Sequence, residues 1–220
     1  MNNIDYSNVV VKKPWGHEYL CYRNGEVAIW FLFIKSGEST SMHCHPTKNT
    51  GLVVLDGEIE LSFIRNKLSL VGLDKIHIFR ARFHSSRAIS NAFLFEVEAP
   101  EDKEDLVRLD DNYGRERKGY EGKEFFEEKN ADHFWLENPS KDPNDVVLHG
   151  CHLKHILVPD VNELMQYGED DLLVFTKGGV ATENEKKILC AGDIVDGHTL
   201  SKIAPKFKII HETSILHIKK

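Results

Sequence analysis

The chain alternates between short apolar runs and polar turns through its first hundred residues. The runs are of strand length, as in VAIWFLFI at 27–34, GLVVLDGEIELSFI at 51–64 and AFLFEVEAP at 92–100. Gly- and Asn-bearing turns separate them, among them Asn24-Gly25, Ser36-Gly37 and Asp56-Gly57. Many short strands at close spacing predict a β-sandwich or barrel, and residues 27–34, apolar on both faces, predict a central strand.

Composition changes at Pro100. The next thirty or so residues are dense in charge of both signs, with arginines and tyrosines interleaved. This segment can be a solvated connector, or it can lie over the mouth of the barrel and hold an anionic ligand with Arg and Tyr. Residues 123–145 then predict a linker with a short helix, since Asn138-Pro139 and Pro143 break regular structure.

Short strands return from Val146, and a faint internal repeat links the two halves. Residues 51–76 can be laid against 171–195, so that Gly57 falls on Gly178 and Gly72 on Gly192; AFLFEVEAP then falls on ETSILHIKK. A repeat of this kind predicts two related barrels in one chain. We expect the first over residues 1–122 and a degenerate second over 146–220.

Composition excludes several classes of function. The net charge of −7 and pI near 5.9 argue against general nucleic-acid binding. No apolar run approaches the length of about 20 residues that spans a bilayer, and residues 1–16 lack the pattern of a signal peptide. The four cysteines are scattered, as in a protein with reduced thiols. We therefore expect a cytoplasmic protein without membrane or nucleic-acid partners.

Two histidines, His43 and His45, stand one residue apart between strand-like runs. On an extended chain, residues i and i+2 point to the same face, so both imidazoles would enter one space. Two neighbouring imidazoles are a common start of a metal site. Cys44 would point the opposite way.

The surrounding residues resemble a known family. Gly37, His43, His45 and Gly57 resemble the first cupin motif, G-x5-H-x-H-x3,4-E-x6-G, and residues 72–91 with His84 resemble the second. Lys13–Leu20, KPWGHEYL, is similar to the opening segment of mannose-6-phosphate-isomerase-like cupins. The resemblance implies an all-β fold, the cupin double-stranded β-helix or jelly-roll barrel, here duplicated as a bicupin with few short helices.

The resemblance also implies one divalent metal ion (Zn, Fe, Ni or Mn) held by His43, His45 and His84. The motif's glutamate is missing, because Asn49 and Thr50 occupy its place. Three imidazoles alone can hold Zn²⁺ or Fe²⁺, and they leave its charge uncompensated, which favours an anionic substrate.

Further candidates surround this motif. Glu96 and Glu98 share one face of the run at 92–99, which either lines the barrel, where one glutamate would be a general base or fourth ligand, or meets solvent. His77 is a candidate acid or base with a structural role as the alternative. Candidates for binding an anionic substrate are Lys48, Arg87, Arg108, Tyr113 and Arg115.

From this resemblance we expect a metal-dependent isomerase or epimerase that acts on a sugar phosphate or a nucleotide-linked sugar. The alternatives are a three-histidine iron dioxygenase and a non-catalytic ligand-binding barrel. The expected partners are a small anionic sugar and a second copy of the chain, paired as a homodimer through a strand edge.

Overall fold

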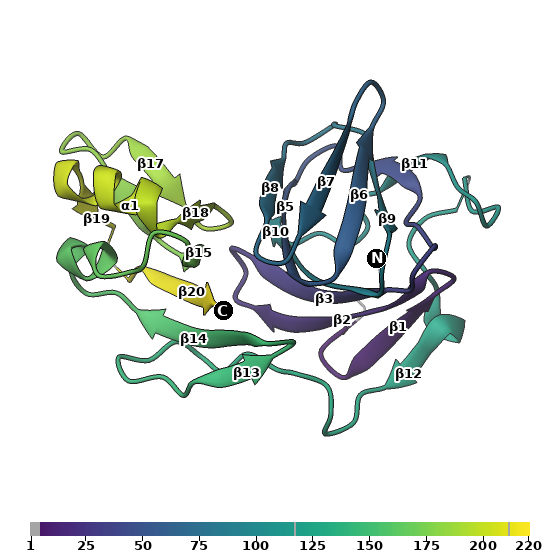
Figure 1. Cartoon of the computed structure of the whole chain (residues 1–220), viewed down its shortest axis with the longest axis horizontal. Coiled ribbons are helices and arrows are strands. Elements are labelled where there is room, and N and C mark those ends of the chain that lie inside the picture. Colours follow the sequence, from purple (N-terminus) through teal and green to yellow (C-terminus); the bar gives the residue numbers. More distant parts are fainter. Residues whose placement is uncertain (1–4, 117, 211) are drawn as a thin grey trace.

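Two β-barrels lie side by side in the structure, a computed structural model that describes residues 5–116, 118–210 and 212–220 (Figure 1). The first barrel consists of two antiparallel sheets, ordered β12-β1-β2-β3-β10-β5-β8 and β11-β4-β9-β6-β7. Its strands are β1 (Val9–Lys13), β2 (Gly16–Arg23), β3 (Ala28–Ile34), β4 (Met42–Cys44), β5 (Asn49–Asp56), β6 (Glu58–Phe63), β7 (Lys67–Val71), β8 (Lys75–Ile78), β9 (His84–Ala88), β10 (Ala92–Ala99), β11 (Val107–Asp110) and β12 (Phe126–Glu128).

The strand order of the first barrel identifies its fold. Eight consecutive strands, β3 to β10, divide between the two sheets as β3-β10-β5-β8 and β4-β9-β6-β7. Two four-stranded sheets connected in this way form the double-stranded β-helix, the jelly roll of the cupins. The predicted all-β cupin fold is confirmed.

The described residues of the second barrel repeat this order without a counterpart of β4. Its sheets run β13-β14-β20-β15-β18 and β17-β16-β19, so β14-β20-β15-β18 corresponds to β3-β10-β5-β8, and β19-β16-β17 to β9-β6-β7. The 3₁₀-helix η2 (Val161–Met165) replaces the strand that would match β4. The strands are β13 (Val146–Leu148), β14 (Cys151–Leu157), β15 (Leu172–Lys177), β16 (Gly179–Ala181), β17 (Lys187–Cys190), β18 (Ile194–Asp196), β19 (Lys208–Ile209) and β20 (Ser214–Lys219).

The glycines of the sequence repeat fall at matching turns. Gly57 and Gly178 precede β6 and β16, and Gly72 and Gly192 precede β8 and β18. The last strands of the two barrels, β10 and β20, match in a register one residue away from that of the sequence repeat. Leu52 pairs with Glu96 in the first barrel, and the equivalent Leu173 pairs with His217 in the second. The boundaries at 122 and 146 stay a prediction; β12, within the expected linker, pairs with β1.

Helices are few and short. Besides η2 they are η1 (Lys123–Phe125), α1 (Gly197–Ile203) and η3 (Ala204–Lys206). Among the described residues, no helix has the length and apolar character needed to cross a membrane.

Strand β3 lies between two apolar cores. Trp30 and Leu32 face the interior of the first barrel, and Ile29 and Phe31 face the second barrel. The second of these cores joins the outer face of the larger sheet to Leu153, Val174 and other residues of β14, β15 and β20. The prediction of a central, doubly covered strand is confirmed, and the two barrels share a buried apolar contact.

Candidate metal centre

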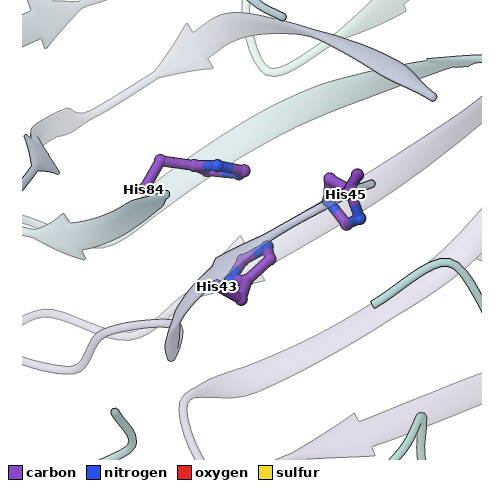
Figure 2. Close-up of side chains that lie close together, drawn as sticks. All are labelled: His43, His45 and His84. Atoms are coloured by element: carbon purple, nitrogen blue, oxygen red, sulfur yellow. The ribbon is translucent and has the colours of Figure 1, made fainter. Parts of the chain in front are cut away.

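Three histidines gather inside the first barrel, on β4, β9 and the residue just after β4 (Figure 2). His43 and His84 are direct cross-strand partners, and His45 follows on the same face as His43. The ring centroids lie 4.4 to 5.6 Å apart, and one nitrogen from each ring lies within 4.8 Å of the others. The two halves of the sequence motif therefore meet as predicted.

Backbone carbonyls fix the orientation of all three rings. The Nδ1–H groups of His43, His45 and His84 donate to the carbonyls of Ser41 (2.8 Å), Asp105 (2.6 Å) and Arg82 (3.0 Å). Because a carbonyl can only accept, Nδ1 carries the proton, and each Nε2 keeps a free lone pair. The Nε2 atom of His45 is buried and has no hydrogen-bond partner among the described residues. Metal-binding histidines are oriented in this way.

Burial keeps the cluster in its neutral form. It lowers the pKa of His45 to about 3, and it lowers the pKa of His84 and, more strongly, that of His43. The proximity of the three rings adds to the effect on His43, since each would repel a second positive charge. Neutral imidazole is the form that binds a metal, so these residues fit a divalent ion.

No carboxylate completes the cluster among the described residues. Thr50 is buried on β5, and its hydroxyl has no hydrogen-bond partner in the described part of the chain. The amide oxygen of Asn49 accepts from the backbone N–H of Arg80 at 3.0 Å. Nothing here replaces the missing glutamate, and the donor set is three neutral nitrogens.

A cavity of about 60 Å³ adjoins His43 and His45. Glu96 and Glu98 line it, because β10 turns its glutamate face to the barrel interior and Phe95 and Val97 to the second barrel. Lys48 also lines it, with its ammonium group 2.8 Å from Glu98 Oε1 and 2.7 Å from the Asp102 carbonyl. Of the two alternatives for the glutamate face, the structure adopts the inward one.

Lys103 occupies the centre of this polar interior. Its Nζ lies 3.3 Å from Glu18, 3.4 Å from Glu96 and 3.0 Å from Glu98, and 3.8 Å from the centre of the Trp30 ring. Burial disfavours its charge, but the three carboxylates outweigh burial and raise its pKa.

Glu18 is the second centre of the network. It accepts a hydrogen bond from Tyr120 and lies 3.3 Å from Lys13 Nζ. Burial alone would raise the pKa of Glu18, but Lys103 and Lys13 overcome it and lower that pKa to about 2. No sequence signal points to Lys103. Lys13 and Glu18 lie in KPWGHEYL, and Tyr120 is one of the tyrosines interleaved in the charged segment after Pro100.

Residues 101–116 and 118–121 form the roof of the cavity, with Leu106, Arg108, Arg115 and Tyr120 lining it. Both arginines are already paired: Arg115 with Asp111 (2.7 Å) and Glu121 (2.7 Å), and Arg108 with Glu121 (3.1 Å). The charged segment thus lies over the barrel mouth and is not a solvated connector. The proposed contacts of Arg108 and Arg115 with a ligand stay predictions.

Three predicted site residues lie elsewhere. Arg87 is exposed on the outer face of β9, since His84, Ser86 and Ala88 face inward. His77 is on the outer face of β8, packed on Phe79, because Ile76 and Ile78 contact the core. Tyr113 donates its hydroxyl to Glu38 (2.6 Å) and does not line the cavity. The expectation that these side chains reach the metal site is corrected.

Comparisons with known proteins add structural likeness only. No family model and no curated protein matches the chain. Among solved structures, KdgF from Halomonas sp. is similar (14% identity, TM-score 0.40, covering 41% of this chain and 84% of that chain). Similar too are a cupin-2 domain protein from Shewanella frigidimarina (12%, 0.36, 41% and 84%) and the capsular polysaccharide assembling protein CapF from Staphylococcus aureus (15%, 0.42, 50% and 34%).

Proposed function

We propose that the first barrel is a divalent-metal-dependent enzyme that isomerises or epimerises a small anionic carbohydrate, either a sugar phosphate or a nucleotide-linked sugar. One observation carries the proposal: three histidines, each with one ring nitrogen within 4.8 Å of the others, gather beside a buried cluster of lysines and glutamates. His43, His45 and His84 would hold the ion, which would polarise a carbonyl or hydroxyl oxygen of the substrate.

The charge of the interior supports an anionic substrate. Five cations line the cavity, and they are balanced by three lining glutamates together with the buried Asp111 and Glu121 behind them. A divalent ion on three neutral imidazoles would add two positive charges to this balanced interior. A phosphate or carboxylate group on the substrate would neutralise that excess.

Glu96 is the candidate base. Its Oε2 has one distant ionic contact, 3.4 Å to Lys103, whereas Glu98 Oε1 is held by both Lys48 and Lys103. Glu96 therefore makes fewer and longer ionic contacts than Glu98, and it can accept a proton from the carbon beside the substrate's carbonyl. Glu98 would position the two lysines.

Substrate binding requires the roof to open. Ligand pockets commonly enclose about 300–1,000 Å³, and the present cavity of about 60 Å³ is far smaller. Leu106, Arg108, Arg115 and Tyr120 close it from one segment, so an outward movement of residues 101–121 would enlarge it. Closure over a bound sugar would then exclude water.

Metal binding is the first test. Protein stripped with a chelator is titrated with Zn²⁺, Fe²⁺, Ni²⁺ and Mn²⁺ by calorimetry, with elemental analysis of the product. We expect one ion per chain, at least tenfold weaker binding in His84→Ala, and unchanged binding in the matched control His77→Ala. A wild-type chain that binds none of the four ions would contradict the proposal.

Proton transfer is the second test. Metal-loaded protein is incubated in D₂O with a panel of sugar phosphates and nucleotide sugars, and deuterium uptake at carbon is followed by NMR. We expect uptake with at least one substrate and none in Glu96→Gln, which should still bind the metal. Oxygen consumption by the Fe²⁺ form would instead favour the dioxygenase, and ligand binding without deuterium uptake would favour the non-catalytic barrel.

A further inference from the structure

The second barrel has a groove of its own, with a volume of about 410 Å³. It lies on the inner face of β14 and β20 and is bordered by η2 and the residues after it. The polar side chains that line it are Lys141, Asp142, His152, Lys154, Glu163, Gln166, Tyr167, Asp171, His217 and Lys219. Its volume falls within the range common for small-molecule sites.

The groove occupies the position that the cavity occupies in the first barrel. His217 pairs with Leu173 and Lys154 as Glu96 pairs with Leu52 and Trp30. By the same register Lys219 matches Glu98. Each barrel thus places polar side chains at the same inward positions, next to an apolar layer that includes Leu94 in one and Ile215 in the other.

The missing strand explains why this groove is open. In the first barrel, β4 pairs with β9 and β11 and helps to enclose the cavity. In the second, η2 occupies that place in the chain, and it makes no ladder with β19. Tyr167, just beyond η2, therefore lines a groove and not a closed interior.

A histidine–aspartate pair stands at the base of the groove. His217 is 8% exposed, and its Nε2–H donates to Asp171 Oδ2 at 2.7 Å. With the proton on Nε2, Nδ1 is left as an acceptor, and it has no hydrogen-bond partner among the described residues. The Tyr167 ring lies against His217, with 4.7 Å between centroids. Nδ1 can therefore accept a hydrogen bond from a ligand hydroxyl in the groove.

The charges of the groove balance. Three lysines, Lys141, Lys154 and Lys219, face three carboxylates, Asp142, Glu163 and Asp171. Such a surface offers no net attraction to a strongly charged ligand. It offers donors and acceptors in near-equal number beside an aromatic ring pair, and a sugar hydroxyl both donates and accepts. A sugar ring also has an apolar face suited to packing on Tyr167.

We propose that this groove is a second binding site, specific for an uncharged saccharide of one or two rings. Lys154 and Lys219 donate to its hydroxyls, His217 Nδ1 accepts from one, and Tyr167 packs on the ring. The site needs no metal and does not depend on the chemistry of the first barrel.

Saturation-transfer difference NMR tests this site on the metal-free full chain, with glucose, galactose, mannose, N-acetylglucosamine and their disaccharides as probes. We expect transfer to at least one sugar. Binding should weaken at least tenfold in Lys154→Ala and Tyr167→Ala, and remain unchanged in His84→Ala and in Lys187→Ala, an exposed lysine on β17.

Folding is checked by the melting temperature of each variant; the Lys154 side chain is 39% exposed, so that variant should keep the wild-type value. The proposal is overturned if no probe shows transfer, or if binding survives Lys154→Ala. It is also overturned if His84→Ala abolishes binding, because the sugar would then occupy the first barrel. Failure of the metal titration would leave this result untouched.

Discussion

Arg115 braces the roof of the first cavity from within, because its partners Asp111 and Glu121 belong to the same segment. Its guanidinium group makes two hydrogen bonds to the Asp111 carboxylate and a third to Glu121, and all three side chains are nearly buried. Two-point Arg–carboxylate pairing combines strength with a fixed geometry. These ion pairs join parts of the roof to one another. Lys103, hydrogen-bonded to Glu98 of β10 at 3.0 Å, and the short ladder between β11 and β4 join the roof to the barrel.

Removing this guanidinium should loosen the roof. Arg115→Met leaves the buried Asp111 without its guanidinium partner and removes one of the cations that contact Glu121, so we expect a loss of about 3 kcal/mol in unfolding free energy. Urea denaturation measures the loss, and hydrogen exchange should show residues 101–121 losing protection before β5 does. The control Arg87→Met, exposed on β9, should stay within about 0.5 kcal/mol of wild type. Equal losses in the two variants would show that the roof is held by other contacts.

The sequence locates the histidines better than their surroundings. His43 and His45 are close in the chain, so strand periodicity alone brings them together, and the second motif supplies His84. Periodicity also shows why Arg87 does not reach the site. Arg87 lies three residues after His84 on the same strand, and since His84 faces inward, Arg87 must face outward. Lys13 and Glu121 are 108 residues apart, and no local pattern reveals that such residues meet.

Tight turns position the strands that carry this site. Gly57 joins β5 to β6 with φ at +88°, and a β-carbon there would lie 2.2 Å from the Asn91 carbonyl oxygen. Gly178 holds the matching place in the second barrel, with φ at +67°. The repeat therefore preserves a backbone shape that only glycine adopts without strain.

Gly57→Ala should be more damaging than a substitution at an open turn with the same backbone angle. Gly25 also has φ at +88°, but nothing lies within 4 Å of its would-be β-carbon. Gly25→Ala should therefore report the conformational strain alone, about 1–2 kcal/mol. Gly57→Ala should add about 1–3 kcal/mol for the steric clash. Urea unfolding of both variants gives the difference, and equal midpoints would contradict the assigned clash.

Strand-length runs in the sequence predict the elements well, and helices less so. The runs at 27–34, 51–64 and 92–99 become β3, the consecutive strands β5 and β6, and β10. Helix α1 was not predicted, although a signal exists: Asp196 caps it by accepting from the Thr199 N–H at 2.7 Å. A capping residue before only seven helical positions carries too little periodicity to be distinguished from a turn.

His155 lies where the two barrels meet. It is 3% exposed, its ring packs edge-on against Tyr22 at 4.7 Å, and its Nδ1–H donates to the Glu137 carbonyl at 2.6 Å. The Thr176 hydroxyl donates to its Nε2 at 2.9 Å. This network requires a neutral ring, and burial accordingly lowers the pKa of His155.

Acid should weaken the molecule through this residue. Below pH 6.5 the imidazole of His155 binds a proton in the unfolded state but stays neutral in the folded state. The contribution of neutral His155 to stability is therefore complete above pH 6.5, and it declines as the pH falls toward the lowered pKa of the folded state. In His155→Gln, the loss of unfolding free energy between pH 7.5 and 5.0 should shrink by up to about 2 kcal/mol. Thr176→Val should lower stability while keeping the wild-type pH dependence. Identical losses in wild type and His155→Gln would refute the assignment.

The apolar contact between the barrels has a consequence for protein synthesis. The ribosome completes residues 9–128 before it begins 146–219, so Phe31, Val53 and Phe95 await the strands that cover them. At about 5–20 residues per second, residues 129–219 take roughly 5 to 18 s to make. During that interval the nascent chain displays a folded but uncovered apolar sheet. Chaperone binding, or aggregation in its absence, should therefore concentrate on that face.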